Sequence, residues 1–393
     1  MRDPAPTVLD AAPDSLAGRP IRVLHVLEAI GGGTARHLID LVRYVPDVQH
    51  DSVTPARRVD GLSDDGALAE LRAAGCVVHV VPMRRNPAHP ANLQAIWRIR
   101  RLIQERGFDI VHGHSSVGGA IARLAAAGTG CVRVYTPHAL ATGALAMRTE
   151  QLLRPLTDHM IAVSASEAEL AVKLRVIARG RVSVVPNGIE SELPTSARDL
   201  RSLLGLDPST PLIGTISRLV PQKAPDQFVR ACLEIAKQRP DAHFVLIGDG
   251  PLRSSVRAMI GSSADGLRIH HLPDLEKPAW ALGALDVFCL TSRFEGGPYT
   301  PLEAMRAGIP VVVTDAVGSR DAVEAGVSGV VVPIDDWAAM AKAVLRLLDD
   351  SELAARLAAA GRERFNSQFR VQTMGLATRK VYECLVPRPE KQA

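Results

Sequence analysis

The chain has 393 residues, of which 47% are hydrophobic, and this is more than one compact core usually holds, so two domains are expected. No run of about 18 apolar residues occurs, which excludes an evident membrane-spanning helix. The net charge of +4 is small, and no basic platform with interleaved aromatic residues accompanies it, so nucleic acid is not an expected partner.

The N-terminal segment and the cysteines indicate where the protein works. Residues 1–20 are rich in Pro, Ala and Asp and lack the apolar core of a signal peptide, so we expect a disordered lead-in. The five cysteines are scattered and form no CxxC pair. They predict neither a disulfide framework nor a zinc site, and they fit a reducing cytoplasm.

From residue 21 onwards, short β-branched segments alternate with helical patterns, which is typical of α/β architecture with parallel sheets. In the first half the predicted strands are Arg22–Leu27, Val77–Val81, Ile110–Gly113, Val132–Thr136, His159–Val163 and Val182–Pro186. Helices are predicted between them at Thr34–Val45, Ala91–Arg106 and Gly118–Ala127.

The same alternation restarts after a polar, turn-rich stretch at Asn187–Pro211, which fits an interdomain connection. The second series of predicted strands is Leu212–Ser217, His243–Gly248, Leu267–His271, Val287–Leu290, Val311–Asp315 and Gly329–Val332. A helical segment follows at Ala354–Leu385. We therefore predict two Rossmann-like domains, at 21–190 and 191–365, that face a central cleft. Residues 366–393 are predicted to form a helix that packs back on the first domain, and a tail.

The segment from Arg293 to Pro333 carries the strongest chemical signal. Glu295 and Glu303 flank a glycine-rich loop that precedes a short helix and a buried strand. Carboxylates accept hydrogen bonds from hydroxyls, and the N–H groups at a helix start attract phosphate. The segment is therefore a candidate sugar-nucleotide site.

A structural alternative exists for Glu303. Thr300, Pro301 and Glu303 also fit a capping box, with Thr at the N-cap, Pro at the first and Glu at the third helical position. In that interpretation Glu303 serves only the start of a helix at Pro301–Ala307. Glu295 has no comparable structural role in the sequence.

Seven blocks in order resemble the retaining glycosyltransferases of family 4, which have the GT-B fold. They are GGGTARHLIDL (31–41), DIVHGHSSVGGAIARLAA (109–126), YTPHAL (135–140), VVPNGIE (184–190), ISRLVPQKAPDQFVRA (216–231), VLIGDGPLR (245–253), and Glu295-x7-Glu303 with EAMxAGxPVVVTD after it. The resemblance implies transfer of a hexose-type sugar, with retention, from a nucleotide diphosphate donor, with UDP favoured over GDP.

The resemblance also assigns roles to individual residues. Arg218 and Lys223 match the basic pair that neutralises the donor diphosphate, Glu303 the group that holds the ribose hydroxyls, and Glu295 the group that contacts the donor sugar. His138 matches the histidine beside the reacting carbon, although by itself it could equally be a core or turn residue. The implied catalytic set is His138, Glu295, Arg218 and Lys223. The implied donor-binding set is Gly32, Gly33, Arg218, Lys223, Gly248, Gly250, Gly296, Gly297, Pro298, Leu302 and Glu303.

Other ligand classes fit the sequence less well. GGGTAR lacks the GxGxxG spacing of a dinucleotide site, and no metal set or DxD motif is present, so we expect neither a cofactor nor a metal. The chain departs from the family pattern at Ala139, Pro273 and Asp321, which leaves the donor open. A glycosyltransferase that tailors a small molecule and a GT-B-like sugar-nucleotide epimerase remain alternatives.

The basic segment Met83–Arg106 has two interpretations, an ordinary solvated helix face or a surface that touches anionic lipid. It lies in the half where the family binds its acceptor. A glycan or lipid-linked acceptor is therefore expected, and the enzyme would be cytoplasmic or peripheral at the inner face of the cell membrane.

Overall fold

The computed structural model describes residues 19–56, 65–140, 143–194, 199–262, 268–273, 275 and 277–386. The chain divides into two compact units. Unit 1 is Met1–Pro186 with Val371–Ala393, and unit 2 is Asn187–Arg370. The predicted lead-in at 1–20 lies almost wholly outside the described residues.

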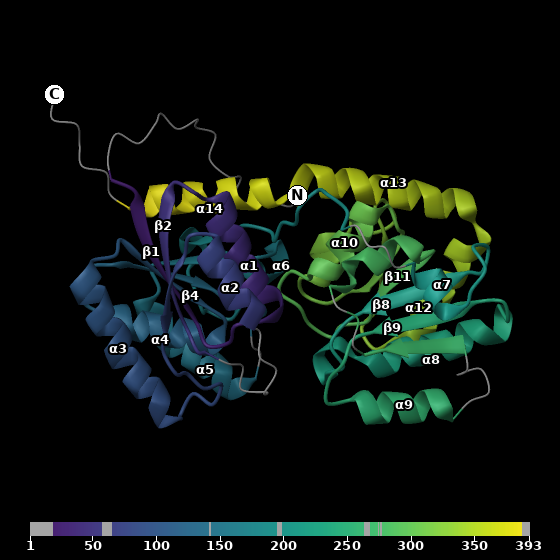
Figure 1. Ribbon diagram of the computed structural model, residues 1–393, viewed down its shortest axis with the longest axis horizontal. Helices are drawn as coiled ribbons and strands as arrows, with labels where there is room; N and C mark the ends of the chain where they lie inside the picture. Colours follow the sequence, from purple (N-terminus) through teal and green to yellow (C-terminus); the bar gives the residue numbers. More distant parts are fainter. Residues whose placement is uncertain are drawn as a thin grey trace. The chain divides into compact units, whose positions relative to one another are not determined.

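Unit 1 is built on a parallel sheet of seven described strands in the order β3-β2-β1-β4-β5-β6-β7. Figure 1 labels β1, β2 and β4 of this sheet. The strands are β1 (Ile21–Leu27), β2 (Val48–Thr54), β3 (Val77–Val80), β4 (Ile110–His114), β5 (Val132–Thr136), β6 (His159–Ala162) and β7 (Val182–Val184). Each described strand after β1 follows a helix, because parallel neighbours cannot be joined by a tight turn.

Helices cover both faces of this sheet. Leu24 and Val26 face α3 and α4, whereas Val23 lies in the core shared with α1 and α14. The helix that closes the chain, α14, packs on α1. The helices are α1 (Gly32–Tyr44), α2 (Asp65–Ala73), α3 (Pro90–Arg106), α4 (Ser116–Ala126), α5 (Ala144–Leu153), α6 (Ala165–Lys173) and α14 (Val371–Leu385).

Unit 2 repeats the design with a parallel sheet of six described strands in the order β10-β9-β8-β11-β12-β13. The strands are β8 (Leu212–Ile216), β9 (His243–Ile247), β10 (Ile269–Leu272), β11 (Val287–Leu290), β12 (Val311–Thr314) and β13 (Val330–Val332). Most of these residues are buried and apolar, as expected of strands that are covered on both faces.

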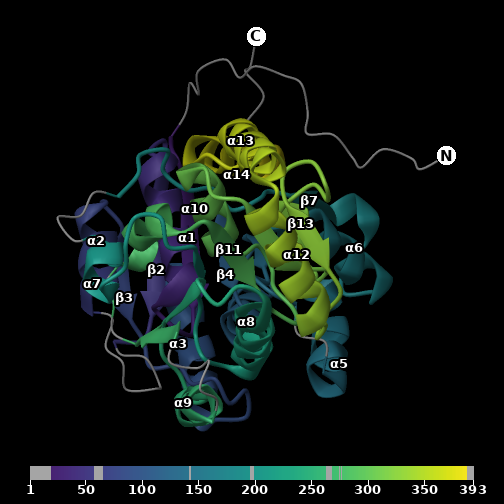
Figure 2. The ribbon, with the colours of Figure 1, turned by 90° about the vertical axis from the view of Figure 1, so that its right-hand side faces the viewer.

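The helices of unit 2 form one layer on each side of its sheet. α8 and α12 pack side by side over one face (Figure 2), and α10 packs with α13 over the other. The helices are α7 (Leu200–Leu204), α8 (Pro225–Gln238), α9 (Arg253–Gly261), α10 (Tyr299–Ala307), α11 (Ser319–Ala322), α12 (Trp337–Asp349) and α13 (Ser351–Gln368). Short 3-10 turns, η3 (Pro221–Lys223) and η5 (Pro278–Ala284), complete it.

One strand escaped the sequence analysis. β2, with the sequence VQHDSVT, lies beside β1 and is buried along most of its length. His50, Asp51, Ser52 and Thr54 are each at most 5% exposed. Polar residues at such positions do not resemble an apolar strand, so this part of the sheet was invisible to a pattern based on hydrophobicity.

The stretch predicted as an interdomain connection, Asn187–Pro211, begins where unit 1 ends, and its described residues belong to unit 2. Asn187 already belongs to unit 2, where its side-chain amide donates to the carbonyl of Gly297 at 2.7 Å. Leu200 is buried in the unit 2 core, and the Arg201 guanidinium donates to the Ala284 carbonyl and pairs with Asp286. The few apolar and charged side chains within the polar stretch dock it onto the unit.

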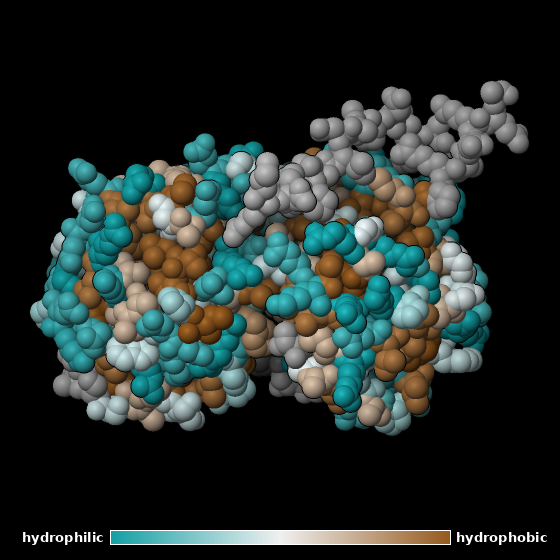
Figure 3. Space-filling view, turned by 180° about the vertical axis from the view of Figure 1, so that it is seen from behind, coloured by the Kyte–Doolittle hydropathy of each residue, from teal (hydrophilic) through white to brown (hydrophobic). Residues whose placement is uncertain are grey.

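Among the described residues, no helix has both the length and the apolarity needed to cross a bilayer. On the face shown in Figure 3, hydrophilic side chains interrupt the apolar patches of both units.

Candidate functional site

Each sheet has a point at which the chain reverses the direction of strand addition. In unit 1 this point lies between β1 and β4, and in unit 2 it lies between β8 and β11. Loops at the carboxyl ends of such strands separate, and ligands of doubly wound sheets bind there. The sequence-predicted residues of unit 2 follow β8, β9 and β11, and those of unit 1 follow β1 and β5.

In unit 2 the structure brings two predicted residues into direct contact. The Lys223 ammonium donates to Glu295 Oε1 at 2.5 Å, and the Ser292 hydroxyl donates to the same oxygen at 2.6 Å. The side chain of Lys223 is only 16% exposed, and that of Glu295 is 8% exposed. Lys223 ends the turn after β8, and Glu295 lies in the loop after β11. The ion pair therefore joins the two loops at the reversal point, and its ammonium is partly shielded from water.

Backbone contacts hold these two loops at a fixed spacing. The Thr291 hydroxyl donates to the Lys223 carbonyl at 2.9 Å, and the Arg293 amide donates to the Gln222 carbonyl at 2.8 Å. The Gln222 side-chain amide reaches the carbonyl of Phe294. Because hydrogen bonds to backbone carbonyls join the two loops, the ammonium of Lys223 is positioned before any ligand arrives.

The capping-box alternative for Glu303 is wrong. Helix α10 begins at Tyr299, its N-cap is Pro298, and no side chain caps it. Thr300 is therefore already inside the helix, and Glu303 lies beyond the third helical position. Glu303 is 6% exposed, so its carboxylate lies at the edge of the core and does not cap the helix.

The remaining predicted residues of unit 2 lie around this pair. Arg218, two residues after the end of β8, is exposed, whereas Gly296, Pro298 and Leu302 are buried. Gly297 is partly buried, and its carbonyl is fixed by Asn187. The two predicted cations thus differ in burial, since Lys223 is partly buried and Arg218 is exposed.

The glycines of unit 2 have a packing role that the sequence did not reveal. At Gly248 a Cβ would lie 2.2 Å from the Ser217 carbonyl oxygen, and at Gly250 it would lie 2.5 Å from the Leu219 oxygen. Gly318 meets the Gly296 oxygen in the same way at 2.3 Å. Only glycine permits these loops to cross so closely. Gly248 and Gly250 therefore allow the loop after β9 to pass in contact with the loop after β8.

In unit 1, Gly32 and Gly33 are exposed at the start of α1, which follows β1. Gly31 has φ of 151° and Gly32 has φ of 63°, conformations that favour glycine. The glycines allow the chain to turn sharply from strand to helix. They leave the first N–H groups of α1 without an acidic side chain in the first turn.

His138 follows β5 and has an unusual backbone. Its φ is 59°, and the φ of Ala139 is 147°, where a side chain is strained. Ala139 is the position at which the sequence departs from the family's glycine. Partly buried His138 contacts His114, with Nε2 of His138 3.1 Å from Nδ1 of His114.

His114 is part of a set of buried histidines that the sequence analysis did not assemble. It comprises His25 on β1, His50 on β2, His112 and His114 on β4, and His37 on α1. Burial and the neighbouring rings lower the pKa of His25, His112, His114 and His138 well below the usual range. Burial lowers the pKa of His50 to about 4, although the Val45 carbonyl and Asp51 act in the opposite direction.

Two groups of these rings have spacing that could suit a metal ion. In the sets His25, His112, His114 and His37, His114, His138, one ring nitrogen from each residue lies within 4.8 Å of the others. The nitrogens of His25, His112 and His114 are, however, engaged in hydrogen bonds with protein groups. Hydrogen bonds between protein groups therefore account for the positions of these three rings.

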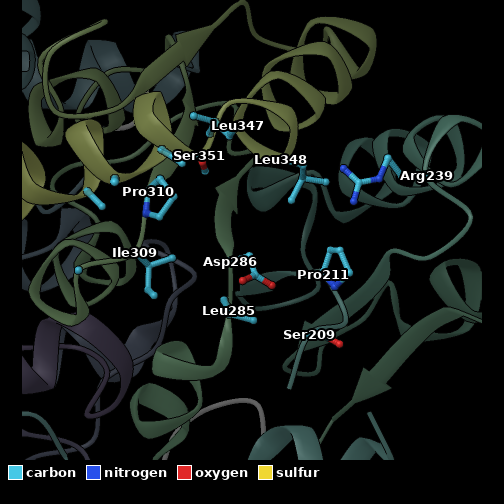
Figure 4. A pocket seen from close by; sticks show the side chains of 14 residues that line it. Ser209, Pro211, Arg239, Leu285, Asp286, Ile309, Pro310, Leu347, Leu348 and Ser351 are labelled. Atoms are coloured by element: carbon cyan, nitrogen blue, oxygen red, sulfur yellow. The ribbon is translucent and has the colours of Figure 1, made fainter. Parts of the chain in front are cut away.

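A cavity of about 400 Å³ in unit 2 is unrelated to the predicted residues (Figure 4). Pro211, Asp286 and Pro310, which line it, directly precede β8, β11 and β12. It therefore lies at the amino ends of the strands, opposite the edge where Lys223 and Glu295 meet.

Comparisons with known proteins match both units. The profile described as "Glycosyltransferase Family 4" matches residues 31–193, and "Glycosyl transferases group 1" matches residues 197–364. The chain is 29% identical over 359 residues to UDP-Gal:alpha-D-GlcNAc-diphosphoundecaprenol alpha-1,3-galactosyltransferase of Escherichia coli, covering 85% of this chain and 89% of the relative. It is 31% identical over 242 residues to the lipopolysaccharide core biosynthesis mannosyltransferase LpsB of Rhizobium meliloti, covering 59% and 68%.

A similar solved structure is Anabaena Alr3699/HepE in complex with UDP and glucose. The TM-score is 0.78 at 19% identity, and the match covers 93% of this chain and all of that one. The structure has two units with parallel sheets, and together with this match it confirms the predicted GT-B fold.

Proposed function

The chain belongs to the group 1 glycosyltransferases of the family 4 type, and from this premise we propose that it moves a hexose-type sugar from a UDP-sugar to a hydroxyl of a lipid-linked oligosaccharide or polysaccharide precursor. The observation that carries the proposal is the contact of Lys223 with Glu295 and Ser292 at the reversal point of unit 2.

This constellation suits a sugar diphosphate. A leaving nucleoside diphosphate gains negative charge, which a fixed ammonium stabilises without reorganising at the moment of reaction. The Lys223 ammonium is already oriented, and its neighbour Glu295 offers a second carboxylate oxygen to sugar hydroxyls. The buried carboxylate of Glu303 is suited to accept hydrogen bonds from the ribose hydroxyls.

UDP is favoured over GDP because of the relatives. The galactosyltransferase named above uses a UDP-sugar by its name, and the Anabaena structure holds UDP with glucose. The first of these relatives acts on a diphosphoundecaprenol-linked sugar, which is the class of acceptor proposed here.

We propose that the anomeric configuration is retained, as the resemblance to family 4 implies. The acceptor oxygen attacks the face of the sugar from which the diphosphate leaves, the C1–O bond breaks, and a diphosphate oxygen takes the hydroxyl proton. Arg218 and Lys223 supply the positive charge that a divalent metal supplies in other transferases. EDTA should therefore leave turnover unchanged, and loss of turnover that Mg²⁺ restores would contradict the assignment.

A lipid-linked acceptor places the enzyme at the inner face of the membrane, and α3 carries a suitable surface. Leu93 is 72% and Trp97 is 62% exposed, and Arg98 lines the same shallow hollow. The Arg101 guanidinium lies 6.0 Å from the Trp97 ring centroid and pairs with Glu105 at 2.6 Å, which leaves Arg98 as the main cation of this surface. Apolar side chains flanked by cations favour anionic headgroups. Arg100 and Arg106 do not contribute, since they bond to the Ala125 and Ala127 carbonyls and to Asp51.

Vesicle flotation tests this surface. The chain should float with vesicles that contain anionic lipid and not with purely zwitterionic ones, and Trp97→Ala should reduce the bound fraction. Leu203→Ala, at an exposed leucine in unit 2, is the matched control. Equal flotation of both variants would remove α3 from the proposal.

The function is tested by a donor screen followed by product analysis. UDP-, GDP- and ADP-sugars are compared by thermal shift, because a tightly bound donor raises the melting temperature by mass action. The best donor is then incubated with diphosphoprenol-linked acceptors, and the anomeric configuration of the product is read by NMR. Conversion of the donor without acceptor would instead favour an epimerase, and transfer only to small aglycones would favour a tailoring enzyme.

A further inference from the structure

The buried histidines of unit 1 form one continuous line of hydrogen bonds. His50 Nε2 lies 3.0 Å from the Val45 carbonyl oxygen, and His50 Nδ1 lies 3.0 Å from His25 Nε2. His25 Nδ1 lies 3.0 Å from His114 Nε2, and His114 Nδ1 lies 3.1 Å from His138 Nε2. Starting from a backbone carbonyl, the line crosses β2, β1 and β4 and ends in the loop after β5.

The carbonyl at one end gives this line a direction. A carbonyl oxygen can only accept a hydrogen bond, so Nε2 of His50 carries the hydrogen. A neutral ring has one N–H, which makes His50 Nδ1 an acceptor and His25 Nε2 a donor. The same step repeated twice places hydrogens on Nε2 of His114 and of His138. The whole line is then satisfied in one arrangement.

The rings are neutral, as this arrangement requires. Burial and the neighbouring rings lower the pKa of His25, His114 and His138, and His50 has a pKa of about 4. A neutral His138 with hydrogen on Nε2 has a lone pair on Nδ1. Among the described residues Nδ1 has no hydrogen-bond partner, and it is not one of the buried unsatisfied atoms.

We propose that the line from Val45 through His50, His25 and His114 fixes the tautomer of His138, so that its Nδ1 accepts a hydrogen bond from a substrate hydroxyl. His25, His50 and His114 are positioning residues that act only through His138. The proposal rests on the proposed function for the identity of the hydroxyl, which belongs to the donor sugar or the acceptor.

The backbone supports the same conclusion. His138 and Ala139 both have positive φ values, and such strained conformations persist only where the surroundings hold them. The bond from His138 Nε2 to His114 is one such restraint. His138 thus combines a strained backbone conformation with a single ring tautomer.

The direct test is NMR of the free protein labelled with ¹⁵N at histidine. The four rings of the line should each show hydrogen on Nε2 and none on Nδ1. The spectrum of His138→Gln identifies the resonances of the His138 ring. A His138 ring with hydrogen on Nδ1, or an even mixture of tautomers, would overturn the proposal. Since no donor or acceptor is present, this result is independent of whether the proposed function is right.

Two substitutions of His25 distinguish the effect of the hydrogen-bond direction from the effect of filling the space of the ring. His25→Gln retains one acceptor for His114 Nε2 and one donor for His50 Nδ1, so the His138 tautomer and most of kcat should be kept. His25→Leu removes both, so His138 should become a mixture and kcat should fall about tenfold, while donor KM stays within twofold. His243→Leu, which breaks the His243–His270 hydrogen bond in unit 2, is the control and should change neither.

The outcomes are distinguishable. If His25→Gln and His25→Leu lose kcat equally, the direction of the line is irrelevant and the proposal is wrong. If His25→Leu does not fold, the spectrum of the unaltered protein and the kcat of His25→Gln still decide it. If no transfer occurs with any donor, the proposed function is wrong, but the tautomer result stands.

Discussion

The two units share a strand order and differ in where they bury their polar groups. In unit 1, His25, His50, His112 and His114 lie within the sheet itself and are almost fully buried. In unit 2 the central strands are apolar, and the charges of Lys223, Glu295 and Glu303 lie in loops and within α10, outside the strands. One sheet contains neutral polar rings, and the other carries an ion pair at its edge.

The difference shows two ways to orient a functional group on one topology. Unit 2 positions its cation by an opposite charge and by backbone bonds between loops. Unit 1 positions a ring through a sequence of identical neutral rings. The first arrangement is sensitive to removal of one partner, and the second is sensitive to protonation.

The largest expected effect comes from breaking the ion pair of unit 2. Lys223→Met leaves a buried Glu295 carboxylate without its cation, and this should lower the free energy of unfolding by about 3–5 kcal/mol. The double variant Lys223→Met/Glu295→Gln should recover most of the loss in urea unfolding while transfer stays low. If Lys223→Met is as stable as the unaltered chain, the pair does not organise the site.

Acid should destabilise unit 1 more than unit 2. The folded pKa of His50 is about 4, below the ordinary 6.5, so its contribution is complete above about pH 6.5 and is lost as pH falls towards 4. His50 alone accounts for about 3 kcal/mol, and His25, His112, His114 and His138 act in the same direction. In unit 2, His243 and His270 also have lowered pKa values but are less buried.

Tryptophan fluorescence can follow each unit separately. A variant with Trp280→Phe and Trp337→Phe retains Trp97 of unit 1, and Trp97→Phe retains the two of unit 2. As the pH falls from 7.5 to 5, the urea midpoint reported by Trp97 of unit 1 should fall more steeply than the midpoint reported by the two tryptophans of unit 2. Parallel declines in both would contradict the contrast between the units.

A smaller effect is expected at Glu303. Glu303→Gln keeps the shape of the side chain and removes its charge, so the dissociation constant of UDP and the donor should rise about 10- to 100-fold. Calorimetry measures the affinity, and the exposed Glu363→Gln on α13 is the control. A loss of stability with unchanged affinity would give Glu303 a structural role alone.

The smallest effect is a gain. Ala139 has φ of 147°, so Ala139→Gly should relieve strain and raise the free energy of unfolding by about 1 kcal/mol. Ala359→Gly, at an exposed position inside α13, should lower it by about the same amount. If Ala139→Gly destabilises the protein as much as this control does, the loop around His138 is not strained.

Most strands were predictable because their apolar, β-branched residues are contiguous. Val132–Thr136 and Val287–Leu290 have the bounds that the sequence predicts, and other predicted strands differ by a residue or two at their ends. β2 was missed because its buried residues are polar. The start of α10 was misplaced because Thr300 and Pro301 imitate a helix start that the structure places at Tyr299.

The sequence by itself determined the family and the two Rossmann-like halves, and it identified the charged candidate residues of unit 2. Each of these lies in short contiguous motifs that can be recognised without the structure. The line of histidines was decided by tertiary structure alone. Its partners are 25, 89 and 24 residues apart, and each residue taken singly resembles an ordinary core histidine. Only the register of parallel strands, which aligns His25 with His112 and His50 with Val23, brings the rings within hydrogen-bonding distance. Hydrogen bonds require that proximity, and nothing in a linear pattern encodes it.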